Sequence, residues 1–426
     1  MIRARHAAIV LLCAASIALG ACSGGNAQKK DSGPYNKALQ ARRDGRLGEA
    51  EKLAGPLAKD GDLKAQLLLA EVLLLRGQHR RARALLEPVF AKNSEHEQTA
   101  ALLAKACDGA GDRDRAIAMY ARRLRLVPTD KDAAIRVSEL LLSKGEAVHA
   151  YRFARAALKS HPRDGAILVL VSRAQLARGM LKPSLDSVNA ALELDMKHAD
   201  AWLQLAKVYE VMGEPRKAIE SFRRCLGVDA QHAEALFGLG SALVQSREYA
   251  QAVGVLERAV KVRPDDPRVL NSYAAALSRA GHHDRAVVAM TRAVEMAPKH
   301  PLLMRNLLEV LLDAGMSVQA DGLARAAVSV SRSKGVRALD QSALEGAVRR
   351  TVVAAAMTRQ LCARQADARA VQVAIRSRLE LLGLAVTDDE MTRLAAATVP
   401  QARAGIKRCR RPKKQQSPPS PKGATP

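Results

Sequence analysis

Apolar side chains recur at helical spacing along most of the chain, in paired stretches that short polar turns separate. Residues 199–232 show the pattern clearly, with apolar or small side chains at Trp202, Leu205, Ala206, Tyr209, Ala218 and Phe222. A helix with one buried face places its apolar residues three or four positions apart, as they are on each side of Gly213. The pattern therefore predicts two packed helices within these 34 residues, joined by a turn at Gly213.

The same pattern returns every 34 residues, with no gap or insertion between residues 63 and 334. Gly stands at position 15 in seven of the eight units and Ala at position 20 in seven, with Arg247 and Ser184 as the exceptions. Gly permits the left-handed backbone that ends a first helix, and a small Ala lets the second helix pack closely against it. The units are 63–96, 97–130, 131–164, 165–198, 199–232, 233–266, 267–300 and 301–334, preceded by a weaker unit at 31–62.

This register resembles the tetratricopeptide repeat. Pro at position 32 of four units also fits, because proline cannot continue the second helix. The resemblance covers residues 31–334 and implies an all-α fold. The expected architecture is a right-handed α-solenoid of about nine helix-turn-helix units that share one continuous core. We therefore expect one solenoid over 34–334 in place of the several domains that length alone suggests.

Residues 335–402 lie outside the 34-residue period, but their pattern also predicts helices. A capping box at 342–345 predicts a helix that ends at about Cys362, and a second helix is expected over about 367–382. Another capping box at 387–390 opens a third helix. We interpret the segment as a helical cap that covers the apolar face of the last repeat. A separate partner-docking module is the alternative.

Residues 1–21 have the pattern of a lipoprotein signal peptide. Two arginines precede an uncharged apolar run over residues 7–19, which is too short for a comfortable membrane span. The run ends in Leu19-Gly20-Ala21-Cys22, which resembles the lipobox of bacterial lipoproteins. The resemblance implies that Cys22 is lipidated and becomes the first mature residue. An ordinary secretory signal that happens to contain a cysteine is the alternative.

The segment after the lipobox, residues 22–33, is polar and rich in glycine, as in a flexible tether. Ser23 follows the lipidated cysteine, and in a Gram-negative envelope a serine there resembles the outer-membrane pattern. The expected location is therefore the outer membrane, with the lipid-anchored chain facing the periplasm.

The formal charge of +25 is unevenly distributed. Residues 31–334 carry 47 basic and 36 acidic residues, whereas residues 403–426 carry eight basic residues and no acidic one. That basic, Pro-rich tail has the composition of a disordered segment. Aromatic residues make up only 3% of the chain, which argues against nucleic-acid binding by base stacking.

Motifs for catalysis are missing from the sequence, which has no phosphate-binding glycine loop with lysine, HExxH, GxSxG or CxxC. We expect no enzyme activity, no cofactor and no metal site. Four histidines stand at position 34 and invite a metal hypothesis: His96, His198, His232 and His300. A polar residue in the turn between units is the simpler interpretation.

The cysteines differ in their expected roles. Cys107 and Cys225 occupy packing positions three repeats apart, which predicts free thiols in the core. Cys362 and Cys409 are the pair that could meet, and in an oxidising periplasm a disulfide could join the tail to the cap. The sequence leaves that bond open.

The resemblance implies that first helices line a concave groove, chiefly through positions 2, 5, 9 and 12. The residues carried over are Ile135, Glu139, Val169, Arg173, Leu203, Lys207, Phe237, Ser241, Asn271, Arg305 and Glu309, with Arg136 and Asn306 bordering them. This set is mixed apolar and basic, which suits a peptide with aliphatic anchors and some acidic groups.

Two functions follow as hypotheses. The resemblance implies a membrane-anchored periplasmic scaffold for protein–protein interaction in envelope assembly: pilus biogenesis, outer-membrane assembly, polysaccharide export or control of cell-wall enzymes. The alternative is a binder of anionic envelope polymers, such as acidic exopolysaccharide or lipopolysaccharide, through basic second-helix faces and the cationic tail. Nucleic acid is not expected as a partner.

Overall fold

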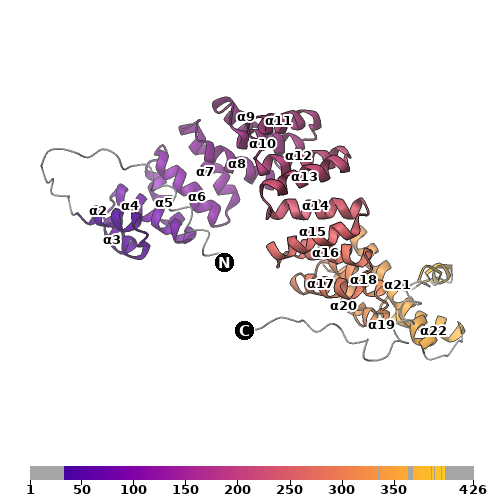
Figure 1. Cartoon of the computed structure of the whole chain (residues 1–426). Helices are drawn as coiled ribbons and strands as arrows, with labels where there is room; N and C mark the ends of the chain where they lie inside the picture. The colour runs from indigo at the N-terminus through magenta and orange to yellow at the C-terminus, as the bar shows by residue number, and fades with distance from the viewer. Residues whose placement is uncertain are drawn as a thin grey trace. The chain divides into compact units, whose positions relative to one another are not determined.

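The computed structural model describes residues 33–333, 336–362, 368–384, 386–387, 389–394 and 396–398. Within these residues every regular element is an α-helix, and the helices follow one another in tandem (Figure 1). The all-α repeat fold expected from the 34-residue period is therefore confirmed. None of the described helices combines the length and the apolar character that a membrane span requires.

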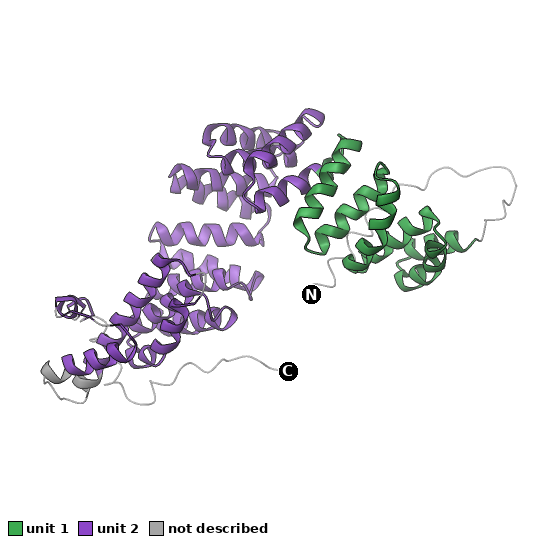
Figure 2. Cartoon of the chain, turned by 180° about the vertical axis from the view of Figure 1, so that it is seen from behind, with its two compact units in different colours: residues 1–133 green, residues 134–426 purple. Residues whose placement is uncertain are grey.

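The chain divides into two compact units, residues 1–133 and 134–426 (Figure 2). The first unit contains three complete helix pairs: α2 (Pro34–Arg43) with α3 (Leu47–Lys59), α4 (Leu63–Leu75) with α5 (His79–Lys92), and α6 (Glu97–Gly109) with α7 (Arg113–Leu126).

The second unit continues the helix pairs and adds the C-terminal helices. Its pairs are α8 (Lys131–Ser143, whose first residues belong to the first unit) with α9 (Ala147–Ser160), α10 (Gly165–Ala177) with α11 (Leu181–Leu194), α12 (Ala199–Met212) with α13 (Pro215–Val228), α14 (Ala233–Gln245) with α15 (Tyr249–Val262), and α16 (Pro267–Arg279) with α17 (His283–Met296). The helices α18 (Pro301–Asp313), α19 (Ser317–Gly322), α20 (Ala324–Ser331), α21 (Ala338–Cys362) and α22 (Ala368–Leu381) follow.

The turn inside each pair has one geometry. At Gly213 the backbone is left-handed, with φ of 75°, and the next amide, Glu214 N, donates to Tyr209 O at 2.9 Å. This is the Schellman arrangement, in which a left-handed residue satisfies the last carbonyls of a helix. Arg247 adopts the same turn with φ of 63°, although it is not a glycine. The turn is therefore imposed by the helix pair, and glycine is the residue that forms it at least cost.

Position 20 of every unit lies in the core. The alanines there, such as Ala116 and Ala218, have no exposed surface, and the exceptional Ser184 is equally buried. Ser184 is accommodated because its hydroxyl lies 2.8 Å from the hydroxyl of Ser172 and donates to Ser172 O at 2.8 Å. The close approach of the two helices thus tolerates a polar pair as well as alanine.

The cap helix α21 begins at Ala338, four residues before the start expected from the capping box at 342–345. The expectation was wrong because Ser342 and Glu345 lie inside the helix, where Glu345 Oε1 accepts hydrogen bonds from Ser331 and Gln341. The second capping box is confirmed. Thr387 N donates to Glu390 Oε2 at 3.1 Å, and Glu390 N donates to Thr387 Oγ1 at 3.3 Å.

The C-terminal helices cover the last repeat, as the cap interpretation expects. Leu344 of α21 and Ile375 of α22 belong to the same buried cluster as Leu307 of α18. The second helix of this repeat is split into α19 and α20 at Leu323. Beside the split, Arg378 of α22 donates to Asp321 Oδ1 and to Asp321 O, each at 3.4 Å, so the cap is bonded to the interrupted helix.

Candidate functional site

Four consecutive first helices, α8, α10, α12 and α14, line a pocket of about 610 Å³ in the second unit. We call it the groove pocket. Its floor is apolar and includes Ile135, Val169 and Leu203. These residues occupy position 5 of three successive units, so the 34-residue period places them in one row. Position 9 lies one helical turn further along the same face and supplies the charged rim.

The charged residues of the rim are paired across neighbouring repeats. Glu139 accepts from Arg136 Nη1 at 3.0 Å on one oxygen and from Arg173 Nη1 at 3.3 Å on the other. Lys207 Nζ donates to Glu234 Oε2 at 2.9 Å. That ammonium holds the pKa of the Glu234 carboxyl below its usual range. Two cations of the groove pocket, Arg173 and Lys207, therefore already have carboxylate partners in the free protein.

The expectation of an apolar and basic groove is wrong in its charge. Four acidic and three basic residues line the pocket: Glu139, Asp200, Asp229 and Glu234 against Arg173, Lys207 and Arg263. Asp200 and Glu234 stand at position 2 of their units, a groove position whose residues are absent from the expected set. Asp229 and Arg263 stand at position 31, in the turn between units, where first-helix positions give no signal. The pocket suits a segment with aliphatic anchors and charges of both signs.

The other groove residues expected from the sequence do not line this pocket. Phe237 is half-buried and packs against the apolar core around α14. Asn306 Nδ2 donates to Asn271 Oδ1 at 2.7 Å, and Arg305 Nη2 donates to Asn306 Oδ1 at 3.3 Å. These three form a separate bonded cluster on α16 and α18. The cap also reaches this cluster, because Arg350 of α21 donates to Glu309 Oε1 at 3.3 Å, and Arg305 lies 3.9 Å from the same oxygen.

The histidines at position 34 cap the first helices. Nδ1 accepts from the backbone amide three residues on in His96 (3.2 Å), His198 (3.4 Å) and His232 (3.3 Å), whereas His300 makes no such bond. In His232 the other nitrogen, Nε2, lies 3.3 Å from Asp200 Oδ1, which fits a proton on Nε2. Three of the four histidines are therefore polar turn residues with a specific role, which is to cap the N-terminus of the next first helix. In the described part of the chain, no group of three or more His, Cys, Asp or Glu side chains is placed to hold a metal.

The described cysteine side chains are buried thiols. Burial raises the pKa of Cys107 to about 11 and that of Cys225 to about 12, so both are protonated at neutral pH. Cys22, Cys409 and the side chain of Cys362 lie outside the described residues. Lipidation of Cys22 and the bond between Cys362 and Cys409 therefore stay predictions.

Several second-helix arginines bond to the preceding repeat and do not simply face solvent. Arg122 Nε donates to Ser94 O at 3.2 Å and Arg258 Nη2 donates to Ala230 O at 2.7 Å, each bond spanning 28 residues. Within its own unit, Arg123 Nε donates to Asp130 Oδ2 at 2.7 Å, and this side chain is only 18% exposed. Binding of anionic polymers would need free cations on the second helices. These arginines are already engaged in hydrogen bonds within the protein.

Two family models match parts of the chain. The tetratricopeptide repeat model matches residues 203–267 and 240–301. The model of anaphase-promoting complex, cyclosome, subunit 3 matches residues 44–119. A search of curated protein sequences found no match.

Solved structures include similar proteins of low identity. A tetratricopeptide repeat protein from Parabacteroides merdae is 18% identical, with 63% of this chain and 98% of that one covered and a TM-score of 0.41. A thermophilic protein of the same kind from Thermus thermophilus is 21% identical, with 42% and 98% covered and a TM-score of 0.37. A chain of the APC/C hetero-tetramer Cut9-Hcn1 is 13% identical, with 89% and 76% covered and a TM-score of 0.45. The matching repeat model, together with helix pairs in an unbroken 34-residue register, identifies this chain as a tetratricopeptide repeat protein.

Proposed function

We propose that this chain is a non-enzymatic scaffold, lipid-anchored at Cys22 to the periplasmic face of the outer membrane, that holds a partner polypeptide in the groove pocket. Its broad class follows from its family, because tetratricopeptide repeats bind protein and peptide partners. The anchor and the location are supported by the signal-like residues 1–21 and the lipobox that ends at Cys22. Pilus biogenesis, outer-membrane assembly, polysaccharide export and control of cell-wall enzymes are the assemblies in which such a scaffold would serve.

The observation that carries the proposal is the groove pocket itself. Its row of aliphatic side chains comes from consecutive repeats at the same position, so a bound segment meets a similar site at each repeat. The rim pairs Arg173–Glu139 and Lys207–Glu234 hold their side chains in place before binding. A preformed site of this kind loses little conformational entropy when it binds.

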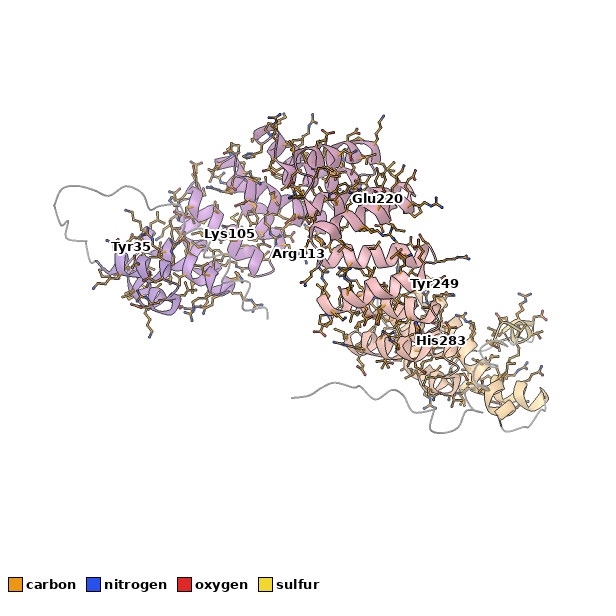
Figure 3. All side chains as sticks on the ribbon, in the orientation of Figure 1. Tyr35, Lys105, Arg113, Glu220, Tyr249 and His283 are labelled. Atoms are coloured by element: carbon orange, nitrogen blue, oxygen red, sulfur yellow. The ribbon has the colours of Figure 1, made fainter. Side chains whose placement is uncertain are left out.

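Crosslinking in the native membrane tests this assignment. A photoreactive amino acid at Lys207, on the pocket rim, should form adducts with one main partner protein identified by mass spectrometry. Glu220 is the matched control position because it lies on the neighbouring helix α13, is exposed and does not line the pocket (Figure 3). Equal adducts from both positions, or none from Lys207, would contradict the groove.

Charge reversal gives an independent measurement. Arg173→Glu with Lys207→Glu places like charges beside Glu139 and Glu234 and should abolish pull-down of the crosslinked partner. The exposed pairs contribute little to folding, so the double variant should keep its melting temperature within a few degrees. Arg305→Glu changes the separate cluster on α16 and α18 and should leave the pull-down unchanged.

Anionic envelope polymers remain the second candidate class of partner. The eight basic residues of 403–426, with no acidic residue among them, favour it. Retention on acidic polysaccharide should then fall steeply with salt and disappear when 403–426 is deleted. Retention that survives the deletion would rule out the tail as the binding element.

A further inference from the structure

The first unit contains another pocket, of about 700 Å³, on a different kind of surface. Its walls are two second helices, α3 and α5, and Leu69 and Leu73 of α4 form its apolar floor. The groove pocket, by contrast, is built from first helices. The pocket between α3 and α5 is therefore a separate candidate binding surface, and its case does not depend on the groove.

One face of α3 alternates glycine with lysine along this pocket. Gly48, Lys52, Gly55 and Lys59 are spaced by four, three and four residues, which places them in one row on a helix. We call this row the Gly–Lys face. A side chain added at Gly48 or Gly55 would meet no atom within 4 Å, so both glycines open onto free space.

The two glycines are specific to this unit. No later repeat has a glycine at either matching position, where for example Arg80 and Glu87 stand in the next unit. Glycine inside a helix is destabilising relative to alanine, and neither glycine touches a neighbour that would exclude a side chain. Helix stability and core packing therefore do not account for the two glycines, whereas they would leave room for the close approach of another helix.

The rim of this pocket carries a net positive charge. Glu51 is the acidic residue that lines it, and this carboxylate bonds to both Arg76 and Arg81. Lys52 and Lys59 are exposed and form no ion pair with any described residue. Four cations thus stand against one carboxylate around an apolar floor.

We propose that the Gly–Lys face binds an amphipathic helix of an acidic partner protein. Aliphatic side chains of that helix would pack over Gly48 and Gly55, and two carboxylates seven residues apart would lie opposite Lys52 and Lys59. Seven residues span about 10.5 Å along any α-helix, so the spacing of the two lysines is matched by the same spacing on the partner. Recognition of an apolar helix face by a groove between helices is a general mode of peptide binding.

Charge excludes the chain's own tail as the occupant. Residues 403–426 carry eight basic residues and no acidic one, so they would be repelled by this rim. An anionic membrane surface shares the sign of the partner but lacks side chains to fill the space above the glycines.

A designed peptide tests the proposal on the full chain. The probe is a fluorescent three-heptad helix with leucine and alanine on one face and glutamate at seven-residue spacing on both sides of it. Fluorescence anisotropy should show binding that weakens with added salt. Lys52→Glu with Lys59→Glu should weaken it at least tenfold, and a peptide with lysine in place of glutamate should bind the reversed variant in preference to the wild type.

The controls separate this surface from general charge effects and from the groove. Lys64→Glu with Lys92→Glu makes the same change in charge on exposed lysines outside the pocket and should leave binding within twofold. Gly55→Leu should weaken binding without changing charge, and Arg173→Glu with Lys207→Glu in the groove pocket should have no effect. Equal binding of acidic and basic peptides, or no loss on reversal of Lys52 and Lys59, would overturn the proposal. So would lysine-dependent binding to phosphatidylglycerol vesicles with no binding of the acidic peptide.

Discussion

At the scale of single residues, the turn inside each helix pair depends on one left-handed backbone position. Arg247 is the position-15 residue that adopts φ of 63° with a side chain, which costs free energy because its Cβ crowds the following carbonyl. Arg247→Gly should raise the free energy of unfolding by about 0.5–1 kcal/mol, since part of the gain is offset by the greater freedom of glycine in the unfolded chain. Urea unfolding measures the change. Gly213→Ala, at the same turn of the preceding repeat, should change stability in the opposite direction.

Position 8 of the repeat gives a second residue-scale prediction. The buried Ser138 hydroxyl has no hydrogen-bond partner, whereas Ser172, one repeat later, bonds to Ser184 and accepts from Gln204 Nε2 at 3.2 Å. An unpaired buried hydroxyl costs about 1 kcal/mol or more, so Ser138→Ala should stabilise the protein by about that amount. Ser172→Ala removes the partner of Gln204 and should destabilise by a similar amount. If both variants shifted the melting temperature in the same direction, this interpretation would be contradicted.

At the scale of elements, the cap depends on apolar contacts between α21 and the last repeat. Leu344 is fully buried in the cluster that joins α21 to α18. Leu344→Ala should lower stability by about 2–5 kcal/mol through lost burial and the cavity that remains. Because repeats contact only their neighbours, amide hydrogen exchange should increase in α18–α22 and stay unchanged in α10–α12. Val373→Ala, on the exposed side of α22, is the matched control and should leave both measurements unchanged.

The sequence predicts elements well where local chemistry determines them. A glycine at position 15, such as Gly213, ends the first helix of its unit, so the helix pairs could be located from the 34-residue period alone. The break at Leu323 could not, because it accompanies bonds from Arg378, a residue 57 positions from Asp321. The sequence places the start of α21 four residues too late, because the Ser and Glu of a capping box are also ordinary residues inside a helix.

In the candidate site, too, the sequence predicts some residues and not others. Leu203 and Lys207 are predicted because first-helix positions repeat with the 34-residue period. Asp229 and Arg263 come from turns between units, and their approach to the pocket depends on how neighbouring repeats pack. The pairing that neutralises the groove is a property of two adjacent repeats, which a position within one repeat does not encode.

At the scale of the whole molecule, the total charge of +25 is a poor guide to what the protein contacts. Within the repeats, basic residues outnumber acidic ones only by 47 to 36, and several are bonded to a neighbouring repeat, as Lys207 is to Glu234. Two places gather cations in excess of carboxylates: residues 403–426, with eight, and the pocket beside the Gly–Lys face, with four against one carboxylate. Salt should therefore affect contacts made by these two regions far more than contacts made in the groove pocket.

Membrane attachment is the whole-molecule property on which the proposed function depends, and one cysteine tests it. If Cys22 carries the lipid, Cys22→Ala should abolish incorporation of labelled palmitate and move the protein from the membrane fraction to the soluble periplasmic fraction. The release should be measured at high salt, because stable anchoring requires the burial of more than one acyl chain, whereas contacts of the basic tail with anionic polymers are screened. Cys13→Ala is the matched control, since Cys13 lies within the apolar run over residues 7–19 and, under the proposal, is removed with the signal. An unlipidated mature chain released to the periplasm from the unsubstituted protein would favour the ordinary secretory signal. A tether of about a dozen residues extends at most about 40 Å, so a confirmed anchor would hold Pro34, where α2 begins, within that distance of the membrane.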